Sequence, residues 1–158
     1  PVFAGVDGSA IENFSCVIYN VSFMNCTWQA GRHAPEDTQY YLYWKNWENM
    51  DEKECELYVT DENGRNTGCR FQNVNIGENK ENIYFLVNGS SKDSLIQFYD
   101  EYIEPYKIEI LTPPLNVTVN CTGDSAGCII TWNPPHTSHL KVVETVQCFE
   151  YEIDIRKK

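Results

Sequence analysis

The residues of this chain best suited to covalent chemistry are its seven cysteines, and their spacing indicates disulfides. No two of them form a CxxC pair, and a short cysteine-rich chain without that motif favours disulfides over zinc. Each loop closed by nearest-neighbour pairing is short, which is worth about 2–3 kcal/mol of stability. The predicted pairs are Cys16–Cys26, Cys55–Cys69 and Cys121–Cys128. Cys148 is left over; we interpret it as a buried free thiol, with a partner outside this sequence or an intermolecular bridge as alternatives.

A second chemical motif is the pentapeptide at 123–127, which matches the GxSxG pattern of serine hydrolases around Ser125. That pattern needs a strand before it, a helix after it and a large α/β sheet below it. The pentapeptide lies between Cys121 and Cys128, where a hairpin turn of small residues is the simpler interpretation. The chain also lacks a plausible His and Asp pair, so we expect no catalytic residue and no enzyme.

His136 and His139 form a third motif, because two nearby imidazoles could suggest a metal pair. Zinc usually takes four ligands, and no other His or reduced Cys pair stands nearby. A solvated loop is the preferred interpretation, and we expect neither a metal nor a cofactor.

N-glycosylation sequons indicate where the protein is made. Six Asn-X-Ser/Thr acceptor sites in one chain favour the secretory route and an extracellular location. They begin at Asn13, Asn20, Asn25, Asn88, Asn116 and Asn120.

The charge balance excludes some classes of partner. Lys plus Arg number 12 against 23 for Asp plus Glu, which gives a net charge of -11. Nucleic acid and anionic membranes require clustered basic residues, so neither is expected as a partner. The acidity favours a partner with a basic patch, or only keeps a glycoprotein soluble. The sequence contains no run of 18 apolar residues, so we expect no membrane insertion by this segment. It also has no signal-like N-terminus, and we therefore expect a piece of an ectodomain.

The elements that must position these residues are predicted to be strands. Seven short strand-like runs separated by turn signals are typical of a β-sandwich of the immunoglobulin or fibronectin type III kind. The expected strands are 14–20, 22–29, 39–46, 55–60, 68–74, 82–88 and 95–100. No convincing helical period is present.

The domain organisation follows from composition and from a repeated unit of cysteine hairpin and tryptophan, which ends at Trp28 and again at Trp132. We predict an all-β fold of tandem fibronectin type III-like sandwiches, the second incomplete. The second sandwich has too few predicted strands to close: two strands at 116–121 and 128–132, and an alternating run at 149–156. The predicted divisions are a linker or tail of an upstream domain at 1–11, a first sandwich at 12–110, a Pro-rich elbow at 111–114 and the start of a second sandwich at 115–158.

An aromatic and acidic turn follows the third predicted strand. Trp44 and Trp47 flank it, and an acidic run begins at Glu48 and continues through Asp51 and Glu52. Aromatic side chains beside charges are good interface anchors. The alternative is that Trp44 packs on the sheet and the acidic residues form a solvated loop.

Several motifs together resemble a known family. Asn13-Phe-Ser-Cys16, Met24-Asn-Cys26-Thr-Trp28 and Gly68-Cys69 occur in order, and 84–91 and 113–121 add longer matches. In these motifs the chain resembles the alpha subunits of class I haematopoietic cytokine receptors. The resemblance implies two sandwiches that grip a four-helix-bundle cytokine, expected to be granulocyte-macrophage colony-stimulating factor, and that assemble with a shared beta receptor subunit. The family's WSXWS motif is absent, and Cys148 before a Phe-X-Tyr run looks more like the interleukin-5 and interleukin-13 receptor relatives.

The resemblance also implies where the cytokine would bind. The family-like contact loops lie at the turn after the third strand, at the turn before the sixth, and in the second sandwich. Their candidate residues are Trp47, Asn49, Asp51, Asn75, Gly77, Glu78, Asn79, His136, Thr137, Ser138 and His139. The protein would be the ectodomain of a single-pass plasma-membrane receptor or a secreted form. The alternatives are a secreted decoy, the alpha subunit of a related interleukin receptor, and a fibronectin type III adhesion module.

Overall fold

The computed structural model describes residues 4–46, 51–74, 82–123, 127–137 and 149–156. Its elements are almost entirely β-strands, which confirms the all-β prediction. One sheet has the strand order β5-β6-β2-β1-β9, and the second has the order β4-β3-β7-β8. The first contains β1 (Glu12–Tyr19), β2 (Phe23–Gln29), β5 (Leu57–Thr60), β6 (Asn66–Phe71) and β9 (Glu109–Ile110). The second contains β3 (Gln39–Lys45), β4 (Lys53–Glu54), β7 (Ile83–Ser90) and β8 (Tyr99–Ile103).

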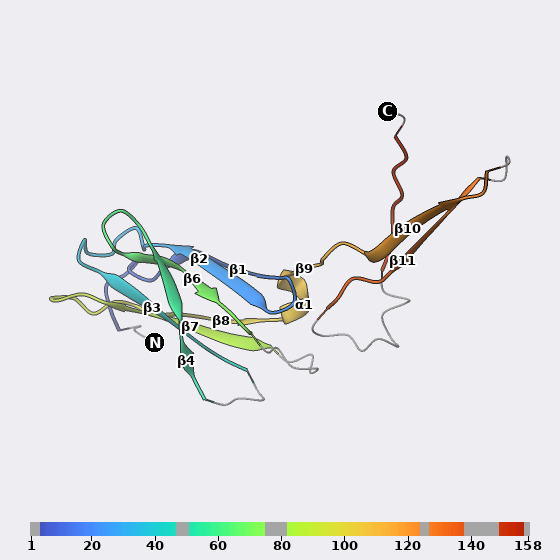
Figure 1. The fold of residues 1–158 in the computed structure, drawn as a ribbon. Coiled ribbons are helices and arrows are strands. Elements are labelled where there is room, and N and C mark those ends of the chain that lie inside the picture. Colours follow the sequence, from blue (N-terminus) through green and yellow to red (C-terminus); the bar gives the residue numbers. More distant parts are fainter. Residues whose placement is uncertain (1–3, 47–50, 75–81, 124–126, 138–148, 157–158) are drawn as a thin grey trace.

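The two sheets pack face to face as a sandwich (Figure 1). Alternate side chains point inward along each strand, which is why β3 buries Tyr40, Leu42 and Trp44. In β7 the buried residues opposite them are Phe85 and Val87. The period-2 pattern of the sequence therefore places one face of every main strand in a single core.

All three disulfides of the structure join the pairs that the sequence predicts: Cys16–Cys26, Cys55–Cys69 and Cys121–Cys128. The first joins directly opposite residues of β1 and β2. Cys69 lies opposite Cys26 on the next strand, so two disulfides are neighbours in the core. Cys148 lies outside the described residues.

The described part of the predicted 1–11 linker is packed against the first sandwich. Val6 forms a parallel bridge with Ile96, and its N–H donates to the carbonyl of Leu95. Ser9 is fully buried, and its carbonyl accepts a 2.7 Å hydrogen bond from the Tyr40 hydroxyl. Residues 4–11 thus complete the end of the core at which β3 begins.

The segment that leads into the Pro-rich elbow contains more regular structure than the sequence indicates. A one-turn helix, α1 (Pro105–Ile108), leads into β9, which pairs in parallel with the end of β1. A proline at the first helical turn favours this start, because its missing N–H has no partner to lose. The Pro-rich stretch 111–114 follows without regular structure.

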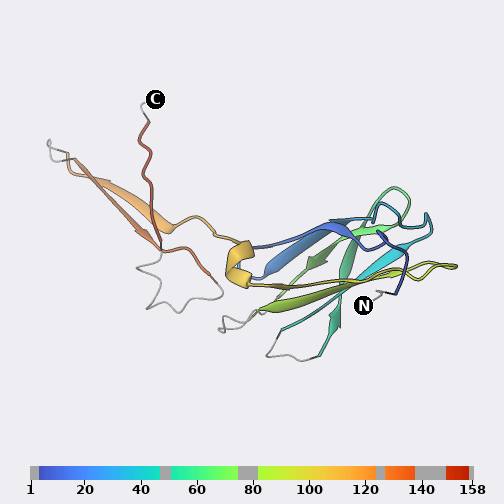
Figure 2. The ribbon, with the colours of Figure 1, turned by 180° about the vertical axis from the view of Figure 1, so that it is seen from behind.

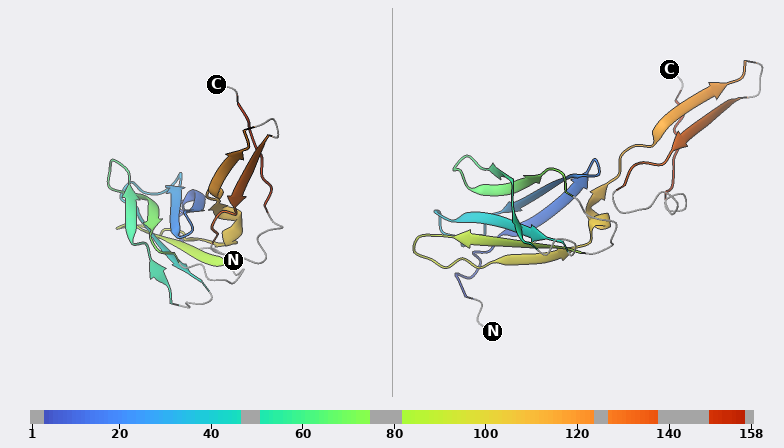
Figure 3. Two further views of the ribbon diagram at one scale, coloured as in Figure 1. Left: turned by 45° about the vertical axis from the view of Figure 1, so that its right-hand side comes forward. Right: turned by 60° about the horizontal axis from the view of Figure 1, so that its bottom comes forward.

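Beyond the elbow, β10 (Leu115–Cys121) and β11 (Cys128–Asn133) form an antiparallel hairpin. From behind and in two further orientations, this hairpin lies apart from the first sandwich (Figures 2 and 3). Its apolar side chains Val117, Val119 and Ile129 are 58%, 60% and 67% exposed. Both faces of the hairpin therefore carry exposed apolar side chains, and no described strand packs against it as a second sheet.

Two strand predictions need correction. The strand expected at 95–100 is displaced to Tyr99–Ile103, because Leu95 and Ile96 pair with Val6 instead of with β7. The strand expected from the alternation at 149–156 is not formed, because no described strand pairs with it. Its Tyr151 ring instead lies 5.2 Å from the Trp132 ring. Among the described residues, no helix has the length and apolar character that crossing a membrane requires.

Candidate functional site

The structure describes three of the candidate contact residues. Asp51 is exposed just before β4, and His136 and Thr137 follow β11, exposed and half-buried respectively. The others lie outside the described residues: Trp47, Asn49, Asn75, Gly77, Glu78, Asn79, Ser138 and His139. The geometry of the candidate site is therefore built from the strands on which the first two loops stand.

The stems of the first two candidate loops end side by side. Lys45, the last residue of β3, pairs with Tyr84 at the start of β7, and Tyr84 pairs with Tyr102 near the end of β8. α1 begins two residues after β8, at Pro105. The loop after β3 and the loop before β7 thus leave the same end of one sheet, and that end meets the elbow (Figure 1).

An aromatic cluster covers this end of the sheet on its outer face. The Tyr84 and Tyr102 rings are 4.8 Å apart, and the Lys45 ammonium lies 5.1 Å from the centre of the Tyr84 ring. The Tyr84 hydroxyl donates a 3.1 Å hydrogen bond to the Asp100 carboxylate. Burial is the main cause, and this hydrogen bond the second, of the raised pKa of Tyr84, which is about 12. The hydroxyl therefore stays neutral and acts as a donor. The cluster offers aromatic area and one cation to a protein partner.

A hollow of about 370 Å³ lies between Tyr102 of this cluster and α1. Tyr102 and Glu101 of β8 line one wall, and Lys107 of α1 lines another. Glu104 and Lys107 form a 2.8 Å ion pair across the first turn of α1. The Lys107 ammonium, as hydrogen-bond donor, lowers the pKa of the Glu104 carboxyl, so both groups carry charge at neutral pH.

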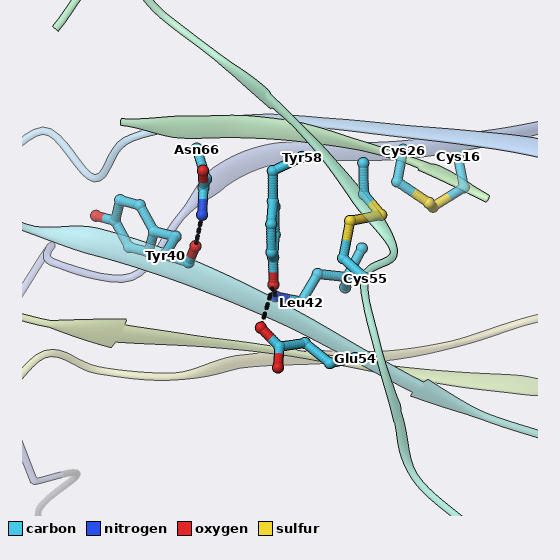
Figure 4. Close-up of a disulfide and its surroundings, with 9 residues drawn as sticks. Cys16, Cys26, Tyr40, Leu42, Glu54, Cys55, Tyr58 and Asn66 are labelled. Atoms are coloured by element: carbon cyan, nitrogen blue, oxygen red, sulfur yellow. Dashed lines mark hydrogen bonds between the residues drawn. A yellow bond between two sulfur atoms is a disulfide. The ribbon is translucent and has the colours of Figure 1, made fainter. Parts of the chain in front are cut away.

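Tyr58 fixes the chain that leads out of the acidic turn. Its hydroxyl accepts a 3.0 Å hydrogen bond from the Leu42 N–H and donates a 3.2 Å bond to the Glu54 carboxylate (Figure 4). The N–H of the next residue, Cys55, donates to the Leu42 carbonyl at 2.9 Å, and its disulfide ties the segment to β6. Both backbone groups of Leu42 are therefore satisfied by the segment that carries the acidic turn.

Replacing Tyr58 with phenylalanine is expected to lower the free energy of unfolding by about 1–2 kcal/mol, because the Leu42 N–H loses its acceptor. Burial raises the pKa of Tyr58 well above its usual value. Above pH 10 the unfolded wild type therefore ionises while the folded form does not, and wild-type stability falls. The gap between wild type and Tyr58→Phe should narrow above pH 10 in urea denaturation.

Tyr41→Phe is the matched control, because it removes a hydroxyl for which the structure records no hydrogen bond. Its ring packs edge-on against Tyr58 at 6.2 Å, and that contact is kept. We expect a change within about 0.5 kcal/mol. Equal losses for the two variants would contradict the role of the Tyr58 hydroxyl.

The sequon asparagines differ in their surroundings. Asn25 is half-buried, whereas the other five are exposed: Asn13, Asn20, Asn88, Asn116 and Asn120. In the folded chain Asn13 donates a 2.8 Å hydrogen bond to Gln29. The amide oxygen of Asn25 is buried without a hydrogen-bond partner. All six remain predicted acceptor sites.

The described residues of the two chemical motifs lie outside helices and strands. Gly123 and Gly127 of the GxSxG pentapeptide fall between β10 and β11, and the element that follows is a strand and not a helix. Ser125 itself and His139 lie outside the described residues. Within the described ranges, no cluster of three or more His, Cys, Asp or Glu side chains is placed to hold a metal ion.

Sequence reasoning missed the residues that shape the site. Tyr58, Tyr84 and Tyr102 were not singled out. Tyr58 lies opposite Cys69 and packs against the core, whereas Tyr84 and Tyr102 each stand one position from an inward-facing residue and therefore on an outward face. An aromatic residue at an outward position of a period-2 strand is the signal that points to Tyr84 and Tyr102. Their mutual contacts depend on cross-strand register, which a single strand does not specify.

Comparison with known proteins indicates the same family as the sequence motifs that resemble cytokine receptor alpha subunits. A sequence profile described as "Interleukin-6 receptor alpha chain, binding" matches residues 13–108, which span the first sandwich and end at α1. The chain belongs to the class I cytokine receptor alpha-chain family. The matched segment contains both stems of the candidate loops and the first two disulfides of this cytokine receptor alpha chain.

Individual relatives extend the similarity along this cytokine receptor chain. Human interleukin-5 receptor subunit alpha is 35% identical over 166 residues, covering 96% of this chain and 37% of that protein. Mouse granulocyte-macrophage colony-stimulating factor receptor subunit alpha is 31% identical over 133 residues, covering 84% of this chain and 33% of that protein. Human interleukin-13 receptor subunit alpha-2 is 31% identical, and the match covers 97% of this chain and 38% of that protein. The chain thus spans about a third of the length of these relatives.

Proposed function

We propose that this chain is the ligand-binding ectodomain part of a cytokine receptor alpha chain, and that it binds a four-helix-bundle cytokine. The observation that carries this proposal is the convergence of the β3 and β7 loop stems at the elbow end of the first sandwich. Beside those stems lies a surface of aromatic rings and charges formed by Lys45, Tyr84 and Tyr102. Such a surface suits a protein ligand better than a small molecule, because it is open and shallow.

We propose granulocyte-macrophage colony-stimulating factor as the ligand and interleukin-5 as the second candidate. The motifs at 84–91 and 113–121 support the first, together with the 31% identity to the mouse receptor subunit of that name. The 35% identity to the human interleukin-5 receptor subunit supports the second. In either case the chain would supply cytokine specificity, and a shared beta receptor subunit would supply signalling.

The proposed location is extracellular, on a plasma-membrane receptor or on a secreted form of it. Three disulfides and six sequons support this location, since both belong to the secretory route. We further propose that the chain carries out no reaction. Its GxSxG pentapeptide joins two strands of a hairpin, so the strand-to-helix context of a hydrolase nucleophile is lacking.

Biosensor binding of the glycosylated ectodomain tests this function directly. The analytes are granulocyte-macrophage colony-stimulating factor, interleukin-5 and interleukin-13, with fluorescence of the buried tryptophans as the check that the protein is folded. Saturable binding of the first alone is the expected result. Binding of interleukin-5 alone would mean that interleukin-5 is the ligand, and the proposed function as a cytokine receptor would stand. A folded protein that binds none of them would contradict the proposal and favour the adhesion module.

A further inference from the structure

An exposed sequon lies beside an apolar groove at the end of the first sandwich away from the elbow. The groove has a volume of about 470 Å³ and is lined in part by Asn88, Leu95 and Phe98. Leu95 is 63% exposed and Phe98 is 55% exposed, although both are large apolar side chains. An exposed apolar surface of this kind is a sign that something covers it.

Asn88 stands between two exposed aromatic rings on the outer face of this sheet. Tyr41 of β3 is its directly opposite partner on one side, and such partners have Cβ atoms about 4.5–5.5 Å apart. On the other side the β7–β8 register ends at Val87 opposite Tyr99, one residue from Asn88 and one residue from Phe98. Asn88 and Phe98 also line the same groove. A group attached to the Asn88 amide would therefore start between two rings.

The other two residues of this sequon differ in what the fold requires of them. Gly89 is required by packing, because a Cβ there would overlap the side chain of Ile96. Ser90 is exposed opposite Gln39, and the structure records no side-chain hydrogen bond for it. Replacing the Ser90 hydroxyl therefore removes the acceptor motif and leaves the fold and the groove intact.

We propose that Asn88 carries an N-linked glycan whose first N-acetylglucosamine lies against Phe98 and covers this groove. The C–H face of a pyranose is apolar and slightly positive, which suits the negative face of an aromatic ring. The glycan would shield Phe98 and Leu95 from water and so stabilise the sandwich. This inference rests on the extracellular placement in the proposed function, but not on cytokine binding.

The glycan would be transferred to Asn88 from a lipid-diphosphate-linked oligosaccharide, which is the donor. The Asn88 Nδ2 forms a bond to C1 of the reducing-end N-acetylglucosamine, and the bond from C1 to the diphosphate oxygen breaks. The lipid diphosphate leaves with the electron pair of that bond, and one amide proton of Asn88 is released.

The test combines site mapping with a double-mutant cycle on the chain secreted from glycosylating cells. Peptide mass spectrometry after enzymatic deglycosylation in ¹⁸O water should show Asn88 converted to labelled aspartate. Ser90→Ala should lower the Tm by about 4 °C, the shift expected for loss of one aromatic contact in a domain of this size. In a Phe98→Ser background the same substitution should give a much smaller shift.

Each alternative outcome overturns a defined part of the proposal. An unmodified Asn88 beside other occupied sequons would exclude the glycan at this site. Equal Tm shifts in the two backgrounds would exclude packing against Phe98. A secreted protein with no occupied sequon would overturn the extracellular placement as well. A modified Asn88 on a protein that binds no cytokine would overturn the proposed function alone.

Discussion

Replacing both Cys16 and Cys26 with alanine is expected to lower the free energy of unfolding of the first sandwich by about 3 kcal/mol. The bridge joins directly opposite residues of β1 and β2 and closes a separation of 10 residues. Without it the unfolded chain regains the freedom that this loop had lost. Because native domains are stabilised by only about 5–15 kcal/mol, the loss is a large fraction of the total.

The location of this bridge adds to the effect. Cys16 and Cys26 are 3% and 1% exposed, and Cys26 lies opposite Cys69 of the neighbouring Cys55–Cys69 disulfide. Two sulfur atoms are therefore removed from a packed core, where the space they leave is not fully reclaimed. The measurement is urea denaturation followed by tryptophan fluorescence, since Trp28 and Trp44 are both buried in this sandwich.

The Cys121–Cys128 bridge provides a matched control. It also joins directly opposite residues of two antiparallel strands, but both of its cysteines are exposed in the β10–β11 hairpin. Replacing this pair with alanine should leave the first-sandwich transition unchanged, because the hairpin lies apart from that core (Figure 1). A first-sandwich midpoint equal to that of wild type after loss of Cys16–Cys26 would contradict the expected stabilisation.

The first sandwich was predictable because its strands carry a strong local signal. β3 shows it most clearly: Tyr40, Leu42 and Trp44 are buried and alternate with less buried neighbours, as the period-2 pattern requires. The disulfide pairs were predictable for a similar reason, since short hairpins bring sequence neighbours together. Strand existence and nearest-neighbour cysteine pairing are both local properties.

The parts that sequence reasoning missed depend on contacts between distant segments. Residues 4–11 have no clear period, yet Val6 pairs with Ile96 and Ser9 is buried under Tyr40. That pairing also explains why the seventh predicted strand, 95–100, was misplaced, because Ile96 pairs with the N-terminal segment and β8 begins only at Tyr99. The alternation at 149–156 failed for the opposite reason: a local pattern forms a strand only when a partner strand is present.

The candidate site was predictable only in outline. Resemblance to a receptor family indicated which loops to consider, but the described structure contains Asp51, His136 and Thr137 alone among the proposed contacts. What the structure adds is the register of Lys45, Tyr84 and Tyr102, which brings the loop stems together. Register is set by turns and by packing across strands, so no single segment of the sequence contains it.

Charge reversal in the acidic turn is expected to slow cytokine association by roughly tenfold at low ionic strength. Asp51 and Glu52 are exposed immediately before β4, at the elbow end of the first sandwich. Lys53, the residue after Glu52, pairs with Trp44, which directly precedes Lys45 of the aromatic cluster. The change is Asp51→Lys with Glu52→Lys, and it leaves the Glu54 bond to Tyr58 intact.

The physical reason is long-range steering of a ligand with a basic patch. Exposed charges that sit at the edge of an interface act mainly on the rate of encounter, and they act less once salt screens them. The measurement is biosensor association at several ionic strengths. The slowing should shrink steadily as salt rises, while the dissociation rate should change little.

A matched control separates a local effect from the change in net charge. Glu62 and Asp93 are also exposed, and they lie in turns at the end of the sandwich away from the elbow. Glu62→Lys with Asp93→Lys changes the net charge by the same amount, so an effect of total charge alone would slow both variants equally. If the cytokine docks at the elbow end, only the Asp51 and Glu52 pair should slow association strongly. Equal slowing by both pairs would remove the acidic turn from the proposed binding surface and leave only the overall acidity of the chain as the attracting field.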